Sequence, residues 1–126
     1  MRFMMLMIPA VKDDNWMPSP EAVGAMTRFN QDMINAGVML TGEGLHPPSK
    51  AARVSFGGDA PKVTDGPFAE AREVVGGYWM IQAKSRAEAV EWARRCPAAP
   101  GDVIEIRQVM EMSDFPEDVQ KAAGRK

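Results

Sequence analysis

The apolar residues of this 126-residue chain are grouped in short segments, and their spacing changes from that of strands to that of helices. The segment from Arg2 to Ile8 is almost wholly apolar and has the length of a buried strand, which Pro9 ends. After a polar connection, apolar residues recur every three or four positions, which predicts a helix with one apolar stripe. The stripe consists of Ala22, Met26, Phe29, Met33 and Ala36.

Residues that begin and end helices flank this stripe. Ser19 is the expected N-cap, and Pro20 suits the first helical position, where its missing N–H costs nothing. Gly37 supplies the left-handed residue that often follows a last turn. A second helix is expected to begin after Ser85 and to run to Pro97, and its inward residues are Ala89, Val90, Ala93 and Cys96.

The remaining ordered segments have the composition of strands. The hairpin among them turns at Gly57-Gly58-Asp59 and returns through Lys62 to Asp65. The other expected strands are Val38 to Leu45, Ala51 to Phe56, Gly77 to Ala83 and Val103 to Val109.

This order, β-α-β-(hairpin)-β-α-β, predicts an α+β fold with a ferredoxin-like antiparallel sheet and both helices on one face. We expect a single domain over residues 1–112, followed at 113–126 by a polar tail or peripheral helix. The face without helices would carry Met, Trp, Tyr and Val side chains and expose a large apolar patch. A second copy of the chain is the natural cover, so we expect a homodimer.

Composition and charge limit the classes of partner that this protein is expected to bind. The net charge of −2, with fifteen Lys and Arg scattered along the chain, argues against nucleic acid. The longest apolar run, at residues 1–10, is about half the length of a membrane-spanning helix, so we expect no membrane partner and a cytoplasmic protein. The single cysteine, Cys96, is expected to serve packing.

His46 is the only histidine, so imidazole acid/base chemistry near neutral pH depends on it. Pro47 and Pro48 follow directly and stiffen the backbone where the ring leaves the second strand. The alternative is a loop histidine in solvent. Asp65 precedes Gly66-Pro67, so its carboxylate is expected either to satisfy N–H groups of its own turn or to orient an imidazole, and both roles are compatible.

Other residues are candidates for binding a small-molecule substrate. Arg53 could neutralise a neighbouring carboxylate or hold an anionic ligand, and Tyr78 and Trp79 point to opposite faces of one strand, so only one of them can enter a cavity on the open face. The full candidate set is Glu43, Arg53, Phe68, Glu73, Tyr78 and Trp79, with Glu70 nearby. One histidine and one cysteine do not make a closed zinc site within one chain, although a dimer could pool two copies. No phosphate-binding loop or serine elbow is present either, so we expect no metal and no cofactor.

Two segments, TGEGLHPPSKAARVSF (41–56) and VTDGPFAEAREVVGGYW (63–79), resemble the YCII-related family, in particular the branch known by its Asp-Gly-Pro-Phe signature, here residues 65–68. The resemblance extends from Arg2 to about Met112. It implies a dimeric α/β barrel in which two sheets pack face to face. Members of the wider family pair one His with one Asp in a pocket, which implies His46 and Asp65 as the catalytic pair here.

Three hypotheses about function follow. The first is a cofactor-independent enzyme that performs elimination or lyase-type chemistry with His46 and Asp65, since a dehydrochlorinase is known in the wider superfamily. The second is a ligand-binding or sensing protein without turnover, connected to the extracytoplasmic-function sigma factors with which this branch is often associated. The third is a purely structural dimer module.

Overall fold

The computed structural model describes residues 1–10, 13, 15–68 and 74–124. Its strands and helices follow the order expected from the sequence, with short additional helices in the connection after β2 and near the C-terminus. The elements are β1 (Arg2–Ile8), α1 (Pro20–Asn35), β2 (Met39–Gly44), the 3₁₀ helix η1 (Pro48–Lys50), β3 (Ala52–Ser55), β4 (Lys62–Asp65), β5 (Gly77–Gln82), α2 (Arg86–Arg94), β6 (Val103–Gln108), the 3₁₀ helix η2 (Met112–Asp114) and α3 (Glu117–Ala122).

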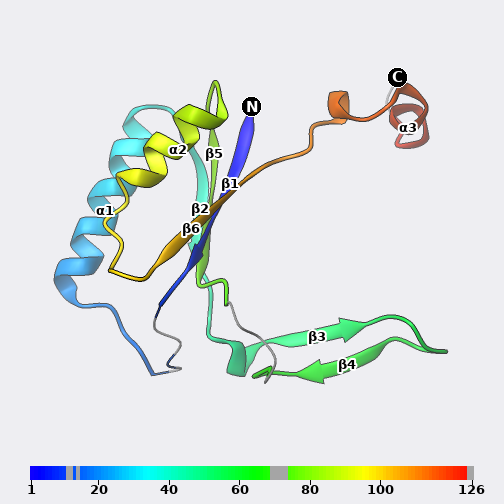
Figure 1. The fold of residues 1–126 in the computed structure, drawn as a ribbon, viewed down its shortest axis with the longest axis horizontal. Coiled ribbons are helices and arrows are strands. Elements are labelled where there is room, and N and C mark those ends of the chain that lie inside the picture. The colour runs from blue at the N-terminus through cyan, green and yellow to red at the C-terminus, as the bar shows by residue number, and fades with distance from the viewer. Residues whose placement is uncertain (11–12, 14, 69–73, 125–126) are drawn as a thin grey trace.

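Four strands form the main sheet in the order β2-β5-β1-β6, and every neighbouring pair is antiparallel. Both long helices, α1 and α2, lie on the same side of this sheet (Figure 1). The predicted α+β, ferredoxin-like arrangement is therefore confirmed, because the chain crosses from β1 to β2 and from β5 to β6 through helices on one face.

The strand register sorts side chains into a helix-covered face and an open face. Met5 lies opposite Trp79, and the next pair along, Leu6 and Tyr78, points the other way. Trp79 is buried, meets Phe29 edge to face with ring centroids 6.0 Å apart, and is the tryptophan of the helix-covered face. The expectation that a tryptophan contributes to the open face is wrong for this strand, because the alternation puts Tyr78 there instead.

The core occupies only the space between the sheet and the helices. The indole N–H of the buried Trp79 has a hydrogen-bond partner, since Nε1 donates to Asn30 Oδ1 at 2.9 Å. The buried core residues are Phe3, Met5, Phe29, Met33, Val38, Trp79, Ile81, Ala83 and Ala89.

The helix ends carry the residues expected there. Ser19 Oγ accepts a hydrogen bond from the Ala22 amide, and Gly37 takes the left-handed conformation with φ of 71°. At α2, Ser85 Oγ accepts from the Glu88 amide, whereas the Glu88 carboxylate accepts from Lys84, one residue before the N-cap. Ordinary capping chemistry thus sets these boundaries, and α2 ends at Arg94, before the expected Pro97.

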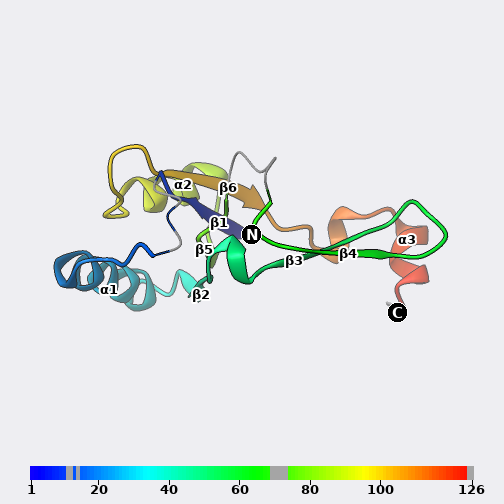
Figure 2. The same cartoon turned by 90° about the horizontal axis from the view of Figure 1, so that it is seen from below.

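Two segments extend from the sheet on the side away from the helices (Figures 1 and 2). One is the hairpin of β3 and β4, which pair only with each other and whose residues are all exposed. The other is the C-terminal segment that contains α3. Glu111, at the start of this segment, forms an ion pair of 2.7 Å with Arg2 of β1. Among the described residues, no helix is long and apolar enough to span a bilayer.

Candidate functional site

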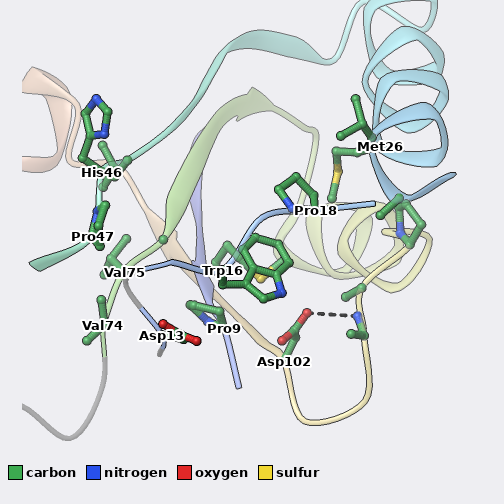
Figure 3. A pocket seen from close by; sticks show the side chains of 18 of the residues that line it. Pro9, Asp13, Trp16, Pro18, Met26, His46, Pro47, Val74, Val75 and Asp102 are labelled. Atoms are coloured by element: carbon green, nitrogen blue, oxygen red, sulfur yellow. Dashed lines mark hydrogen bonds between the residues drawn. The ribbon is translucent and has the colours of Figure 1, made fainter. Parts of the chain in front are cut away.

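A pocket of about 490 Å³ lies on the helix side of the sheet, and we name it the α1 pocket (Figure 3). Its walls come from the end of β1, the connection into α1, the first turns of α1, the loop after β2, the residues before β5, and the connection from α2 to β6. Most of the lining is apolar. The described lining residues are Met7, Pro9, Asp13, Trp16, Pro18, Ala22, Val23, Met26, Thr27, Leu45, His46, Pro47, Pro48, Val74, Val75, Gly76, Pro97, Ala98, Ala99 and Asp102.

Hydrogen bonds between distant segments hold these walls in place. Asp102 uses both carboxylate oxygens, accepting from the amide of Ala10 and from the amide of Ala99, each at 2.9 Å. The Gly76 amide donates to the Met7 carbonyl at 2.8 Å, and the Gly76 carbonyl accepts from Leu45 at 2.9 Å. These bonds join the end of β1 to the connection between α2 and β6, and they join β1 and the loop after β2 to the residue before β5. The pocket walls are therefore held by the fold itself.

A smaller, more open pocket of about 310 Å³ adjoins the first on the hairpin side, and we name it the Arg53 pocket. The guanidinium of Arg53 lies over the ring of Phe68, with 3.8 Å from Cζ to the ring centroid, which is cation–π geometry. Its lining residues are Leu45, His46, Pro48, Ala51, Arg53, Phe68, Val74 and Val75.

His46 lines both pockets and is exposed. Figure 3 shows its ring at the edge of the α1 pocket, pointing away from Trp16. The side chain forms no hydrogen bond within the part of the chain that the structure describes. An exposed imidazole at the junction of two pockets can exchange a proton with a ligand in either of them.

Asp65 is exposed at the end of β4, opposite Ala52, and lines neither pocket. Its carboxylate makes no hydrogen bond to any described residue, so it does not serve its own turn in the way the sequence suggested as one alternative. The turn itself packs tightly on the loop that carries His46. The Gly66 amide donates to the Ala51 carbonyl at 2.8 Å, and a Cβ at Gly66 would overlap the Pro48 carbonyl oxygen.

The other residues proposed from the sequence fall into three places. Arg53 and Phe68 line the Arg53 pocket, whereas Glu43 and Tyr78 lie opposite each other on the open face of the sheet. Trp79 lies in the core. Glu73 and its neighbour Glu70 fall outside the described residues.

Sequence reasoning missed most of the α1 pocket, including Trp16, Met26 and Asp102. It treated the residues between β1 and α1 as a polar connection. A signal was present there, because Trp16 is a large aromatic side chain in a largely polar connection. Trp16 is 55 % exposed in the structure, so much of its indole ring is accessible to a ligand.

Cys96 is not a candidate nucleophile. It packs against the core, and burial, followed by the negative charge of Asp102, raises the pKa of its thiol to about 11. A thiol with that pKa is almost wholly protonated at neutral pH. Within the described ranges, no three side chains of His, Cys, Asp or Glu gather in a way that could hold a metal ion.

Residues 1–113 match the family described as the YCII-related domain. No curated protein matches the chain.

The tight fit at Gly66 makes a prediction about the signature turn. Replacing Gly66 with Ala forces the turn away from Pro48, so we expect a loss of about 1–3 kcal/mol in the free energy of unfolding and a shift of the His46 ring signals in NMR spectra. Urea denaturation and a proton–carbon correlation spectrum measure the two effects.

The matched control is Gly58→Ala, in the connection between β3 and β4. A Cβ at Gly58 meets its nearest neighbour, the Ala60 carbonyl oxygen, at 4.0 Å, so this change should be close to neutral. Equal stability of the two variants would mean that the turn is not held against Pro48.

Proposed function

The chain belongs to the YCII-related domain family, and we propose that this protein binds a small, largely apolar molecule in the α1 pocket. The observation that carries the proposal is the pocket itself. Its volume of about 490 Å³ is in the range of small-molecule sites, roughly 300–1,000 Å³. Apolar walls with a few polar groups at their edges are also typical of such sites.

The walls are suited to binding because they are already formed. Asp102 joins the end of β1 to the connection before β6, and Gly76 joins β1 to the loop that carries His46. A ligand that enters a formed pocket does not have to order the surrounding chain, which lowers the entropic cost of binding. Met7 and Met26 add flexible side chains that adapt to the shape of the ligand.

Acid/base catalysis on the bound molecule is a second candidate function, with His46 as the acid or base and Asp65 as its orienting partner. The supporting observation is that the Asp65-Gly66 turn packs on Pro48 and Ala51, which follow His46 by two and five residues in the same loop. Both side chains are exposed, so each can change rotamer without disturbing the core. The reaction class is cofactor-independent elimination or lyase chemistry. If His46 and Asp65 do not act together, the alternative is a sensor that binds its ligand in the same pocket and does not convert it.

The same turn supports assignment of the chain to the Asp-Gly-Pro-Phe branch of the family. The Gly of the signature, Gly66, is required for close approach to the Pro48 carbonyl. Phe68 provides the surface on which Arg53 stacks. Two positions of the signature thus have physical roles in this turn.

We also propose that the active form is a homodimer that covers the open face of the sheet. Apolar pairs run across this face, with Met4 opposite Met80 and Leu6 opposite Tyr78. Figure 1 shows no helix over them. Charged residues lie at the margin, where Glu105 and Arg107 of β6 form an ion pair of 3.5 Å. An apolar centre with a charged rim is the composition of a protein interface.

Ligand binding in the α1 pocket can be tested with 2-naphthalenemethanol as a neutral apolar probe. The indole N–H signal of Trp16 should shift on titration, whereas those of Trp79 and Trp92, which lie outside the pocket, should not. Ala22→Trp fills the pocket and should weaken binding at least about tenfold, equivalent to 1.4 kcal/mol. Ile34→Trp, on the exposed side of the same helix, should leave the affinity unchanged. Equal affinity of the two variants would place the probe elsewhere.

Coupling between His46 and Asp65 can be tested by NMR. Asp65→Asn should change the nitrogen shifts of the His46 ring, because a carboxylate selects one tautomer and an amide does so less strongly. Asp59→Asn, which makes the same charge change at the tip of the hairpin, is the control. Ring shifts that are the same in both variants would rule out the pair and leave the sensing function.

The dimer can be tested by light scattering after size exclusion. The native chain should elute with about twice its mass of 13.8 kDa. Leu6→Glu, in the middle of the open face, should give monomers, whereas Ile34→Glu on α1 should not. A native chain that elutes as a monomer at micromolar concentration would contradict the proposal.

A further inference from the structure

The described lining of the α1 pocket has an uneven charge. It contains two carboxylates, Asp13 and Asp102, and none of its described residues is Lys or Arg. In Figure 3 both carboxylates lie on the side of Pro9, away from His46. A ligand with a negative charge would therefore enter an apolar pocket in which the fixed charges of the described lining repel it.

These carboxylates are held in position. Asp102 accepts backbone hydrogen bonds on both oxygens, from Ala10 and Ala99, so it cannot rotate away from a ligand without losing them. Asp13 accepts from the amide of Asn15 at 2.9 Å. Carboxylate oxygens have more than one acceptor site each, so both groups can still receive a hydrogen bond from a ligand.

Trp16 contributes an aromatic face to the same pocket. The backbone amide of Trp16 donates to the Asp13 carbonyl at 3.1 Å, which holds the backbones of these two lining residues close together. The ring contacts found in the described part of the chain involve Phe29 with Trp79, Arg53 with Phe68 and Arg95 with Trp92, so none of them covers Trp16. An indole face attracts cations more strongly than any other side-chain ring and also stacks on flat apolar molecules.

We propose that the α1 pocket selects molecules that combine an apolar, aromatic-sized body with a positive charge, such as an amine, over neutral and anionic molecules of the same shape. The inference rests on the proposed function, since it names the ligand class of the same pocket. The body lies among Met7, Met26 and Val23, and the charged group lies between Trp16 and the two carboxylates. Arg53, the residue expected from the sequence to hold an anion, lines the neighbouring pocket instead.

The test compares three probes that share a naphthalene body: 2-naphthylmethylamine, 2-naphthalenemethanol and 2-naphthoate. Affinities are measured by following the Trp16 indole signal at pH 7 and low salt. We expect the amine to bind at least about tenfold more tightly than the carboxylate, with the alcohol between them. The ratio of amine to carboxylate affinity should fall in 0.5 M NaCl, because salt screens the charges of a pocket that is partly open.

Asp13→Asn is the matched variant, because the amide oxygen can still accept from Asn15. It should lower the ratio of amine to carboxylate affinity several-fold, and it should change the affinity for the alcohol less than the affinity for the amine. Asp59→Asn changes the net charge by the same amount at the hairpin tip and should leave the ratio unchanged, which separates the local field from the total charge.

The outcomes distinguish this inference from the function on which it rests. If all three probes bind with equal affinity and Ala22→Trp weakens them all, the pocket binds ligands but does not select by charge, and the inference is wrong. Tighter binding of 2-naphthoate would also overturn it and would direct attention to Arg53. If none of the probes shifts the Trp16 signal, the proposed function fails together with the inference.

Discussion

The structure depends on the central position of β1, which is hydrogen-bonded to β5 on one side and to β6 on the other. This double pairing fixes the strand so that Phe3 and Met5 face the helices and become almost wholly buried. Burial of one such side chain contributes on the order of 1.5–3 kcal/mol relative to exposure. The next residue on the same face, Met7, lies at the end of the strand, where it lines the α1 pocket. The core and the pocket are thus consecutive parts of one strand face.

The two ends of β1 connect this centre to more distant parts of the chain. At the start of the strand, Arg2 binds Glu111 through two side-chain hydrogen bonds and fixes the direction in which the C-terminal segment leaves the sheet. Beyond its end, Ala10 is bound by Asp102, which closes the pocket wall. An exposed ion pair of this kind contributes little to stability, so its effect is on geometry. A single strand therefore positions the core, the pocket and the C-terminal segment.

The one-sided core has a consequence for function. Both long helices, α1 and α2, lie on one face of the main sheet, so no helix of the described residues covers Leu6 and Tyr78 on the other face (Figure 1). The α1 pocket lies on the helix side. Assembly through the open face and binding of a ligand in the pocket therefore use opposite faces of the sheet. The two proposals are therefore compatible, because a ligand in the α1 pocket would not occupy the face proposed for the partner.

The histidine loop links the pocket to the signature turn. His46 lies between two pockets, and the turn that contains Asp65 packs on Pro48 through the close approach of Gly66. The glycine of the signature is explained by this packing, because any side chain there would overlap the carbonyl of Pro48. Asp65 itself extends toward solvent. The signature is therefore a structural support for the histidine loop, whatever further role its carboxylate has.

The sequence alone determined the order of elements, the caps of the helices and the inward stripe of α1, because these depend on residues within a few positions of one another. Ser19 and Gly37 act on their own helix ends, and the spacing of Phe29 and Met33 is set by the helical turn. Alternation also showed that Tyr78 and Trp79 point to opposite faces. Tertiary structure decided which of the two faces is covered, since this depends on where α1 packs. It also decided which residues line the α1 pocket. Trp16, His46 and Asp102 are far apart in the chain and are brought around one pocket only by the strand register and the hydrogen bonds between connections. Periodicity reports the neighbours of a residue along its own element and carries no information about which distant connections come together.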